Sequence, residues 1–268
     1  MFELKSDFIW CIRFKYKVQE FYRLKNMTET LVLGSSYAFY GYRAQKGEFN
    51  FGEPSQDLYY SFEIYKKFSD MPNLKNVVLF YGVFSPGHIL EKTKLNTSCE
   101  FYKKFLSIPY RYNKYDSGIT EKFLICDHFL FHKKFHKNMY GNAVEYLNAN
   151  IKGEEVKERV AGHLKNNRRQ NNQTAFVEKC ASLARQKNHA FYIVLPPFRS
   201  DYTRLLPPFD EVFAPLISLL KTDKSVHFLN YLGDADFCDE DFFDPDHLNL
   251  NGARKLTPKI RSKLTAPV

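Results

Sequence analysis

The chain has 268 residues, of which 44% are hydrophobic, and it carries a formal net charge of +9. This apolar content is ample for a packed core and excludes a fully disordered chain. With only 12 Gly and 12 Pro, collagen-like and linker-like chains are excluded as well. The basic balance suits nucleic acid, anionic lipid or an acidic substrate as a partner, and by itself does not choose among them.

The predicted elements alternate between strands and helices. In chain order we expect a helix within 2–27, strands at 30–33 and 49–52, a helix from Ser55 to Phe68, a strand at 77–81, a helix at 174–187, a strand at 190–195, a helix at 209–220, a strand at 226–229 and a helix from about 251 to 264. This alternation predicts an α/β fold with a parallel sheet covered by helices on both faces.

Two segments fall outside the alternation. Residues 1–29 mix aromatic and basic side chains, and we expect a helix on the domain edge with solvated lysines; the alternative is contact with a membrane surface. Residues 87–172 are rich in Phe, Tyr and Lys, and we expect a mostly helical cap inserted within a single domain that spans 1–268. The insertion holds more basic than acidic residues, so it carries most of the net charge.

Cysteine usage and hydropathy bear on the compartment. The five cysteines include no Cys-x-x-Cys pair, which argues against a disulfide framework and favours a reducing environment. No apolar run reaches the length of a signal-peptide core or of a membrane-spanning helix. We therefore expect a cytoplasmic protein, with a peripheral position at the inner membrane as the alternative for the amino-terminal segment.

Two motifs carry side chains suited to nucleophilic catalysis. Ser36 follows the first strand in a turn opened by Gly34, where a hydroxyl is exposed at the end of the sheet. Asp244 and His247 form an Asp-x-x-His turn after the fifth strand. Because parallel strands present their carboxyl ends at one edge, these groups are predicted to meet as nucleophile, base and orienting carboxylate. Asp246 is the alternative orienting carboxylate.

Together the two motifs resemble the SGNH, or GDSL-like, hydrolase and acyltransferase superfamily. With the Pro-Ser-Gln-Asp-Leu-Tyr-Tyr segment at 54–60 and the Phe-Asp-x-Asp-His-Leu-Asn segment at 243–249, the chain also resembles members encoded with bacterial capsule and surface-polysaccharide genes. That family has a flavodoxin-like three-layer α/β/α fold with a five-stranded parallel sheet. Its Gly-Asp-Ser-type turn corresponds here to Gly34-Ser35-Ser36, with Ser35 in the usual Asp position, and its last motif corresponds to Asp244-Pro245-Asp246-His247. The resemblance covers the regions around 30–87 and 174–264, and leaves the amino-terminal segment and the cap unmatched.

The middle motifs depart from the family pattern. The family's second block supplies a backbone N–H to the oxyanion, which here must come from Gly52 or Ser55. Its third block is Gly-x-Asn-Asp, and the corresponding 82–85 ends in Ser85, so the Asn of the oxyanion hole is absent. Loss of one oxyanion donor costs about 10²–10³ in rate. We expect Ser36, Gly52, Ser55 and Ser85 to form the hole, with Gln56 as a substitute donor that contacts substrate.

These observations lead to two hypotheses about function. The first is an esterase or O-acetyltransferase that acts on a bacterial cell-surface or capsular glycan; it needs no cofactor, although a transferase would need acetyl-CoA or another acyl donor. Lys133, Lys134 and Lys137 would attract an acidic glycan. The second is a glycan-binding or assembly protein that keeps the fold without catalysis, as the missing Asn suggests.

Metal and nucleic-acid sites are the less favoured interpretations. His128, His132 and His136 share one face of a predicted helix, but the surrounding lysines would repel a cation, so we expect no metal. No known nucleic-acid-binding motif is present, and we do not expect nucleic acid as a partner.

Overall fold

The computed structural model describes residues 2–93, 97–112, 120, 122, 124, 139–143, 153–168 and 173–264. Its centre is a five-stranded sheet in which all strands are parallel. The strands are β1 (Thr30–Leu33), β2 (Glu48–Asn50), β3 (Asn76–Phe80), β4 (Ala190–Leu195) and β5 (Val226–Asn230), in the order β2-β1-β3-β4-β5. This is the flavodoxin-like order, in which the chain reverses direction along the sheet beside β1 and leaves a crevice at the strand ends. The predicted fold class is confirmed.

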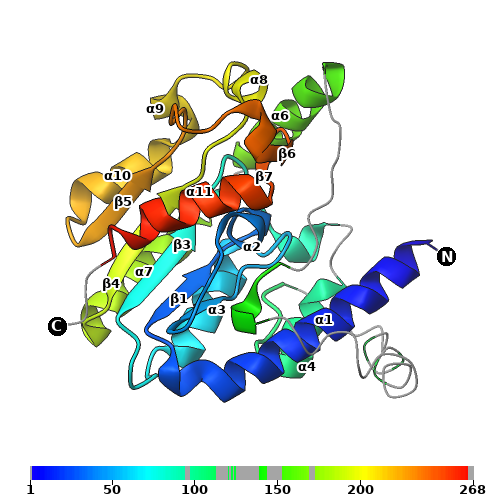
Figure 1. The fold of residues 1–268 in the computed structure, drawn as a ribbon, viewed down its shortest axis with the longest axis vertical. Coiled ribbons are helices and arrows are strands. Elements are labelled where there is room, and N and C mark those ends of the chain that lie inside the picture. The colour runs from blue at the N-terminus through cyan, green and yellow to red at the C-terminus, as the bar shows by residue number, and fades with distance from the viewer. Residues whose placement is uncertain are drawn as a thin grey trace.

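Helices cover both faces of the sheet (Figure 1). α3 and α7 pack against each other on one face, while α11 packs against α2 and crosses in front of the sheet in Figure 1. The helices are α1 (Phe2–Leu24), α2 (Ser36–Gly41), α3 (Leu58–Phe68), α4 (Ser98–Leu106), α6 (Glu154–Asn167), α7 (Thr174–Lys187), α8 (Ser200–Thr203), α9 (Phe209–Val212), α10 (Ala214–Thr222) and α11 (Leu250–Arg261). The remaining elements are the short 3₁₀ helices η1 (Lys25–Met27), η2 (Leu90–Lys92), η3 (Met139–Gly141) and η4 (Asp239–Asp241), and a hairpin of β6 (Phe242–Asp244) and β7 (His247–Leu248).

The central strands are buried on both sides, as expected for a sheet between two helical layers. Val77, Val78 and the rest of β3 are buried, as are all four residues of β1. Continuous apolar runs of this kind are typical of central parallel strands, and they explain why the sequence located β1, β3 and β4 well.

The helix predicted over 209–220 is in fact two helices. α9 ends at Val212 and α10 begins at Ala214, with the fully buried Phe213 between them in a non-helical conformation. Pro215 explains the break, because it has no N–H to bond the carbonyl four residues earlier and its ring would clash there, whereas the first turn of a new helix accepts it. The last helix also differs from expectation, since α11 ends at Arg261 and Leu264 lies beyond it.

The amino-terminal helix is part of the core, and the expectation of solvated lysines is wrong for Lys17. Phe14, Val18 and Phe21 of α1 are buried, and the ring of Phe21 lies against Phe51 in an edge-to-face contact with centroids 5.0 Å apart. Lys17 is 2% exposed; its Nζ donates to the carbonyl of Gly52 at 2.6 Å and to a carboxylate oxygen of Glu53 at 2.8 Å. None of the described helices is long and apolar enough to cross a membrane.

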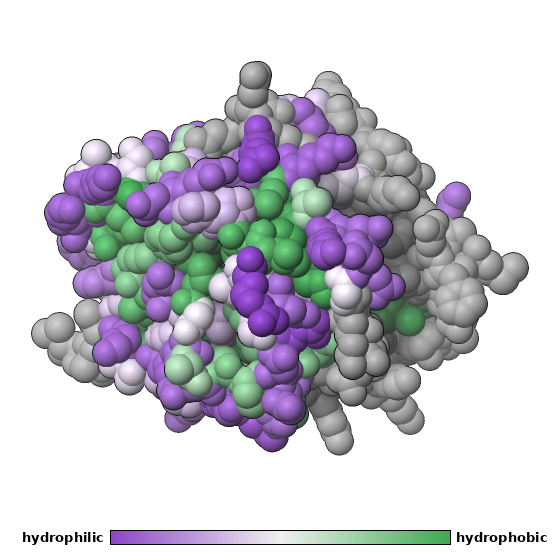
Figure 2. Space-filling view, turned by 90° about the horizontal axis from the view of Figure 1, so that it is seen from above, coloured by the Kyte–Doolittle hydropathy of each residue, from purple (hydrophilic) through white to green (hydrophobic). Residues whose placement is uncertain are grey.

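The described part of the insertion contains α4, α6 and the short η2 and η3, joined to non-helical stretches such as 107–112. α4 packs against α1, and α6 packs against α8 at the upper end of the molecule in Figure 1. Seen from that end, the described surface is mixed: hydrophobic side chains form a band among hydrophilic ones (Figure 2). Lys133, Lys134, Lys137 and the three histidines at 128, 132 and 136 lie outside the described residues.

Candidate active site

The turn after β1 requires glycine at its first position. Gly34 has a φ of +132°, and a Cβ there would lie 2.9 Å from both the Cβ and the carbonyl oxygen of Phe80. Ser35 then caps α2 by accepting the N–H of Tyr37 at 3.4 Å. Ser36 is therefore the first residue of α2, where backbone N–H groups have no partner within the helix.

The turn between β6 and β7 presents the second motif. A carboxylate oxygen of Asp244 accepts the backbone N–H groups of Asp246 at 3.0 Å and His247 at 2.9 Å. Such side-chain-to-backbone bonds are what makes an Asp-Pro segment a stable turn. Asn249 follows and caps α11 by accepting the N–H groups of Asn251 and Gly252. The hairpin and the α11 cap together fix the backbone that carries His247.

The structure brings the three predicted residues together across 211 positions of sequence. His247 Nε2 lies 2.7 Å from Ser36 Oγ, and His247 Nδ1 lies 2.9 Å from an oxygen of Asp244. Asp246 is 3.9 Å from Nε2, the opposite ring nitrogen, so it is not placed to orient the imidazole through Nδ1. In the neutral tautomer that donates Nδ1–H to Asp244, Nε2 is free to accept the hydroxyl proton of Ser36. Ser36, His247 and Asp244 thus form a hydrogen-bonded series, which is the arrangement that a serine nucleophile, its base and an orienting carboxylate require.

Opposing effects set the protonation of His247. Burial alone would lower its pKa, but the carboxylates of Asp246 and Asp244 outweigh burial, and the pKa is raised from its usual value. Asp244 itself is 4% exposed, and His247 is 9% exposed. A buried imidazolium next to two carboxylates is the species that a general base must form after it accepts a proton, so this environment favours that step.

Arg159 of α6 also reaches the site, and the sequence analysis missed it. Its Nε donates to Asp246, and its Nη2 lies 3.2 Å from Asp244 Oδ2 and 3.2 Å from His247 Nδ1. Asp246 also accepts the hydroxyl of Tyr37 at 3.0 Å. The sequence offers no clear signal for Arg159, because it is one of many charges along α6 and its partners lie far away in the chain.

Two of the backbone N–H groups at the expected oxyanion positions already have partners. The N–H of Gly52 donates to the side chain of Asn50 at 2.9 Å, and the N–H of Ser85 donates to the carbonyl of Gly82 at 3.1 Å. The hydroxyl of Ser85 accepts the N–H of Gly82 at 2.9 Å and keeps its own proton for donation. Ser55 adopts a left-handed conformation with φ of 61°, and its carbonyl contacts His88 Nε2 at 2.9 Å. The N–H of Ser36 remains the donor best placed by secondary structure, since it opens α2.

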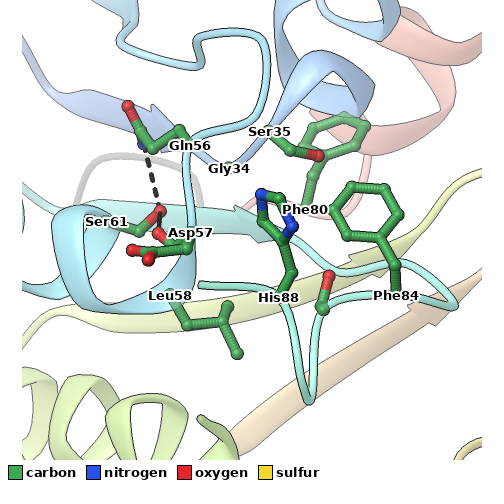
Figure 3. Close-up of a pocket in the computed structure, with 10 residues that line it drawn as sticks. Gly34, Ser35, Gln56, Asp57, Leu58, Ser61, Phe80, Phe84 and His88 are labelled. Carbon is green, nitrogen blue, oxygen red and sulfur yellow. Dashed lines mark hydrogen bonds between the residues drawn. The ribbon is translucent and has the colours of Figure 1, made fainter. Parts of the chain in front are cut away.

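A narrow pocket lies behind the Gly34–Ser35 turn (Figure 3). His88 occupies its middle, with Ser35 and Phe84 on one side and Gln56 on the other. Gln56 is 2% exposed; its amide donates to Ser61 at 3.0 Å and accepts from Tyr102 at 3.0 Å. These bonds make Gln56 a buried structural residue, which argues against the substrate contact that we expected of it.

The β6–β7 turn also contains a set of atoms that could ligate a metal. Ligand atoms of Asp244, Asp246 and His247 all lie within 4.8 Å of one another. However, both carboxylates bond the guanidinium of Arg159, whose positive charge would repel a cation from the same position. The donor set therefore fits a guanidinium better than a metal ion.

Comparison with known proteins adds little to this geometry. No protein-family model matches the chain, and no curated protein matches it. A solved structure from Streptococcus pneumonia, provisionally named a platelet activating factor, aligns with 98% of this chain and 99% of its own length, at 12% sequence identity and a TM-score of 0.45. These comparisons assign no family, so the function has to be inferred from the site.

Proposed function

We propose that the protein is a serine-dependent acyl-ester enzyme of the SGNH type. The observation that carries the proposal is the pair of contacts made by His247, at 2.7 Å to Ser36 Oγ and 2.9 Å to Asp244. A serine hydroxyl is a weak nucleophile until a base accepts its proton, and this arrangement provides both the base and the group that orients it.

The residues define each step of the reaction. Ser36 Oγ attacks the acyl carbonyl while His247 Nε2 accepts the hydroxyl proton, and Asp244 stabilises the imidazolium that forms. The oxyanion faces the N–H groups at the start of α2. When the tetrahedral intermediate collapses, the carbon–oxygen bond to the alcohol breaks and His247 returns the proton to the leaving alkoxide. Water or a second alcohol then attacks the acyl-serine by the same route in reverse, and Ser36 is regenerated.

The second acceptor distinguishes an esterase from an O-acetyltransferase. Water as acceptor gives hydrolysis, whereas a sugar hydroxyl gives transfer, with acetyl-CoA or another acyl donor supplying the acyl group. For the substrate we propose a bacterial surface glycan, supported by the sequence resemblance to proteins encoded with surface-polysaccharide genes. The positive charge of the 87–172 insertion is suited to an acidic glycan.

A second candidate function is a glycan-binding or assembly protein without catalysis. The observation in its favour is that the backbone N–H groups of Gly52 and Ser85, at two of the expected oxyanion positions, already donate internal hydrogen bonds. Weak oxyanion stabilisation would slow ester turnover by about 10²–10³ per missing donor.

Labelling with a fluorophosphonate probe separates the two candidates. This probe forms a covalent bond only with an activated serine, so we expect one adduct per chain, located at Ser36 by peptide mapping. Ser36→Ala should abolish labelling, and Ser35→Ala is the matched control that should retain it. A folded wild-type protein that neither reacts with the probe nor hydrolyses a small acetyl ester would favour the binding protein.

A further inference from the structure

Arg159 connects the insertion to the β6–β7 turn that carries Asp244, Asp246 and His247, which is the catalytic turn of the proposed function. It lies on α6, which is held in place at both ends: Val156 and Val160 are buried, and the side chain of Asn167 donates to the carbonyls of Val83 at 2.6 Å and Val212 at 3.0 Å. The side chain of Arg159 is 26% exposed, and it contacts both aspartates of the turn. Its position is thus fixed by a packed helix and by two carboxylates.

Without Arg159, the two carboxylates of the turn, Asp244 and Asp246, would lose the cation that pairs with them. Asp244 and Asp246 flank one imidazole, and the side chain of Asp246 is fully buried. Each carboxylate favours the protonated form of His247. A histidine that is already protonated at neutral pH has no lone pair on Nε2, and it cannot accept the proton of Ser36.

We propose that Arg159 is a positioning residue that opposes protonation of His247 before reaction, by pairing with Asp246 and by placing a positive charge beside Nδ1. The planar guanidinium suits this role, because Nε can bond one carboxylate while Nη2 faces the other and the imidazole. The proposal rests on the proposed function, since it assigns Arg159 to the base of that same site.

The other charged or titratable groups around His247 do not replace this cation. His163, also on α6, bonds the hydroxyl of Tyr202 at 2.7 Å, and burial lowers the pKa of His163 to about 4, so it is uncharged at neutral pH. Burial raises the pKa values of Tyr37 and Tyr202 well above the usual range, and both stay neutral.

Two further groups face the turn from other elements. Tyr40 of α2 lies edge-on to His247, with ring centroids 5.5 Å apart, and carries no positive charge. Arg199 donates its backbone N–H to Pro245 at 3.0 Å, but its guanidinium pairs with Asp201 at 2.7 Å. Among the described groups, Arg159 is therefore the cation that bonds directly to the carboxylates of the catalytic turn.

The test measures the titration of His247 in two independent ways. The pH dependence of acetyl-ester turnover gives the midpoint at which the base becomes neutral, and an NMR titration of the imidazole gives the same midpoint without any turnover. We expect Arg159→Gln to raise the midpoint by about one pH unit or more, and Asp246→Asn to lower it. Arg159→Lys, which keeps the charge, should hold the midpoint near the wild-type value while kcat falls with the lost geometry.

Controls keep the outcome clear. Arg168→Gln removes an arginine from the end of the same helix, where it pairs with Glu211 on the surface, and it should leave both midpoints unchanged. If Arg159→Gln fails to fold, Asp246→Asn and Arg159→Lys still test the proposal. Unchanged midpoints in folded Arg159→Gln, or an unchanged midpoint in Asp246→Asn, would overturn it. NMR midpoints that shift as expected in a protein without turnover would support the role of Arg159 and count against the proposed enzyme.

Discussion

Two clusters of buried charged side chains connect α1 and α6 to loops at the ends of strands. Cations outnumber carboxylates in the first cluster, and carboxylates outnumber arginine in the second. The amino-terminal cluster, made by Arg13, Lys17 and Glu53, ties α1 to the loop after β2, and it has two cations for one carboxylate. The second cluster, made by Arg159, Asp244, Asp246 and His247, ties α6 to the β6–β7 turn, and it has two carboxylates beside a histidine.

The two clusters differ in which group has a shifted pKa and in the direction of that shift. In the amino-terminal cluster burial lowers the pKa of Lys17 to about 8, although Glu53 opposes the change. In the second cluster the carboxylates outweigh the effect of burial, and the pKa of His247 is raised. The same packing of charged groups thus yields a structural lysine in one place and, in our proposal, a working base in the other, because only the second cluster bonds a serine hydroxyl.

Removing the nucleophile should give the largest effect. We expect Ser36→Ala to reduce ester turnover by about 10⁶-fold, comparable to the loss of a serine nucleophile in a protease triad. Thermal stability should change little, because a single hydroxyl at a helix start contributes little to packing. Turnover and thermal melting measured on the same preparation check this. Retention of most activity would show that Ser36 is not the nucleophile.

Removing the orienting carboxylate should have the next largest effect. Asp244→Asn keeps the shape of the side chain but no longer accepts Nδ1–H as a carboxylate, and we expect kcat to fall by about 10⁴-fold, the loss seen for the corresponding aspartate of serine proteases. Steady-state kinetics measure the loss. A fall smaller than about tenfold would contradict the role of Asp244 in the triad.

The amino-terminal cluster should respond in stability. Glu53→Gln leaves Lys17 and Arg13 buried without their carboxylate, so we expect a loss of about 3–5 kcal/mol in the free energy of unfolding. Urea denaturation at pH 7 measures it. Glu63→Gln is the matched control, because Glu63 pairs with the exposed Lys66 and should change stability by less than about 1 kcal/mol. Equal effects of the two substitutions would contradict a structural role for the cluster.

Lys17 should make stability depend on alkaline pH. Its folded pKa of about 8 lies below the unfolded value of about 10.4, so between these values the unfolded chain holds a proton that the folded chain has lost. Stability relative to Lys17→Met should therefore rise across this window, by up to about 3 kcal/mol, and level off above it. Urea denaturation of both proteins from pH 7 to 11 tests the sign. Parallel curves for the two proteins would show that Lys17 titrates normally in the fold.

The smallest expected effect is at the neighbouring serine. Ser35→Ala removes the side-chain cap of α2, which should cost about 1 kcal/mol or less, since the bond to the N–H of Tyr37 is long at 3.4 Å. Ester turnover should stay within a few-fold of wild type. Loss of turnover in Ser35→Ala with retention in Ser36→Ala would move the nucleophile by one position.

The sequence predicted the sheet and the meeting of Ser36, Asp244 and His247 because both have local signals. Apolar runs such as 77–81 mark central strands whatever their partners, and Ser36, Asp244 and His247 sit in recognisable turns. Arg159 and Lys17 have no such signal, because each is one basic residue among several on a helix. Only the tertiary contacts show that Arg159 meets the β6–β7 turn and that Lys17 is buried. The burial of Gln56 has no sequence signal for the same reason, since its partners Ser61 and Tyr102 are set by packing.

The distance along the chain between Ser36 and His247 has a consequence for biosynthesis. The contact spans 211 residues, and Asp246 meets Tyr37 across 209. A ribosome-bound chain that has emerged only through β5 has the proposed nucleophile but not its base. Because contacts of such long sequence separation tend to form late, reactivity at Ser36 should report the arrival of the β6–β7 hairpin and α11. The time at which a covalent serine probe first reacts with Ser36 would then report when folding is complete.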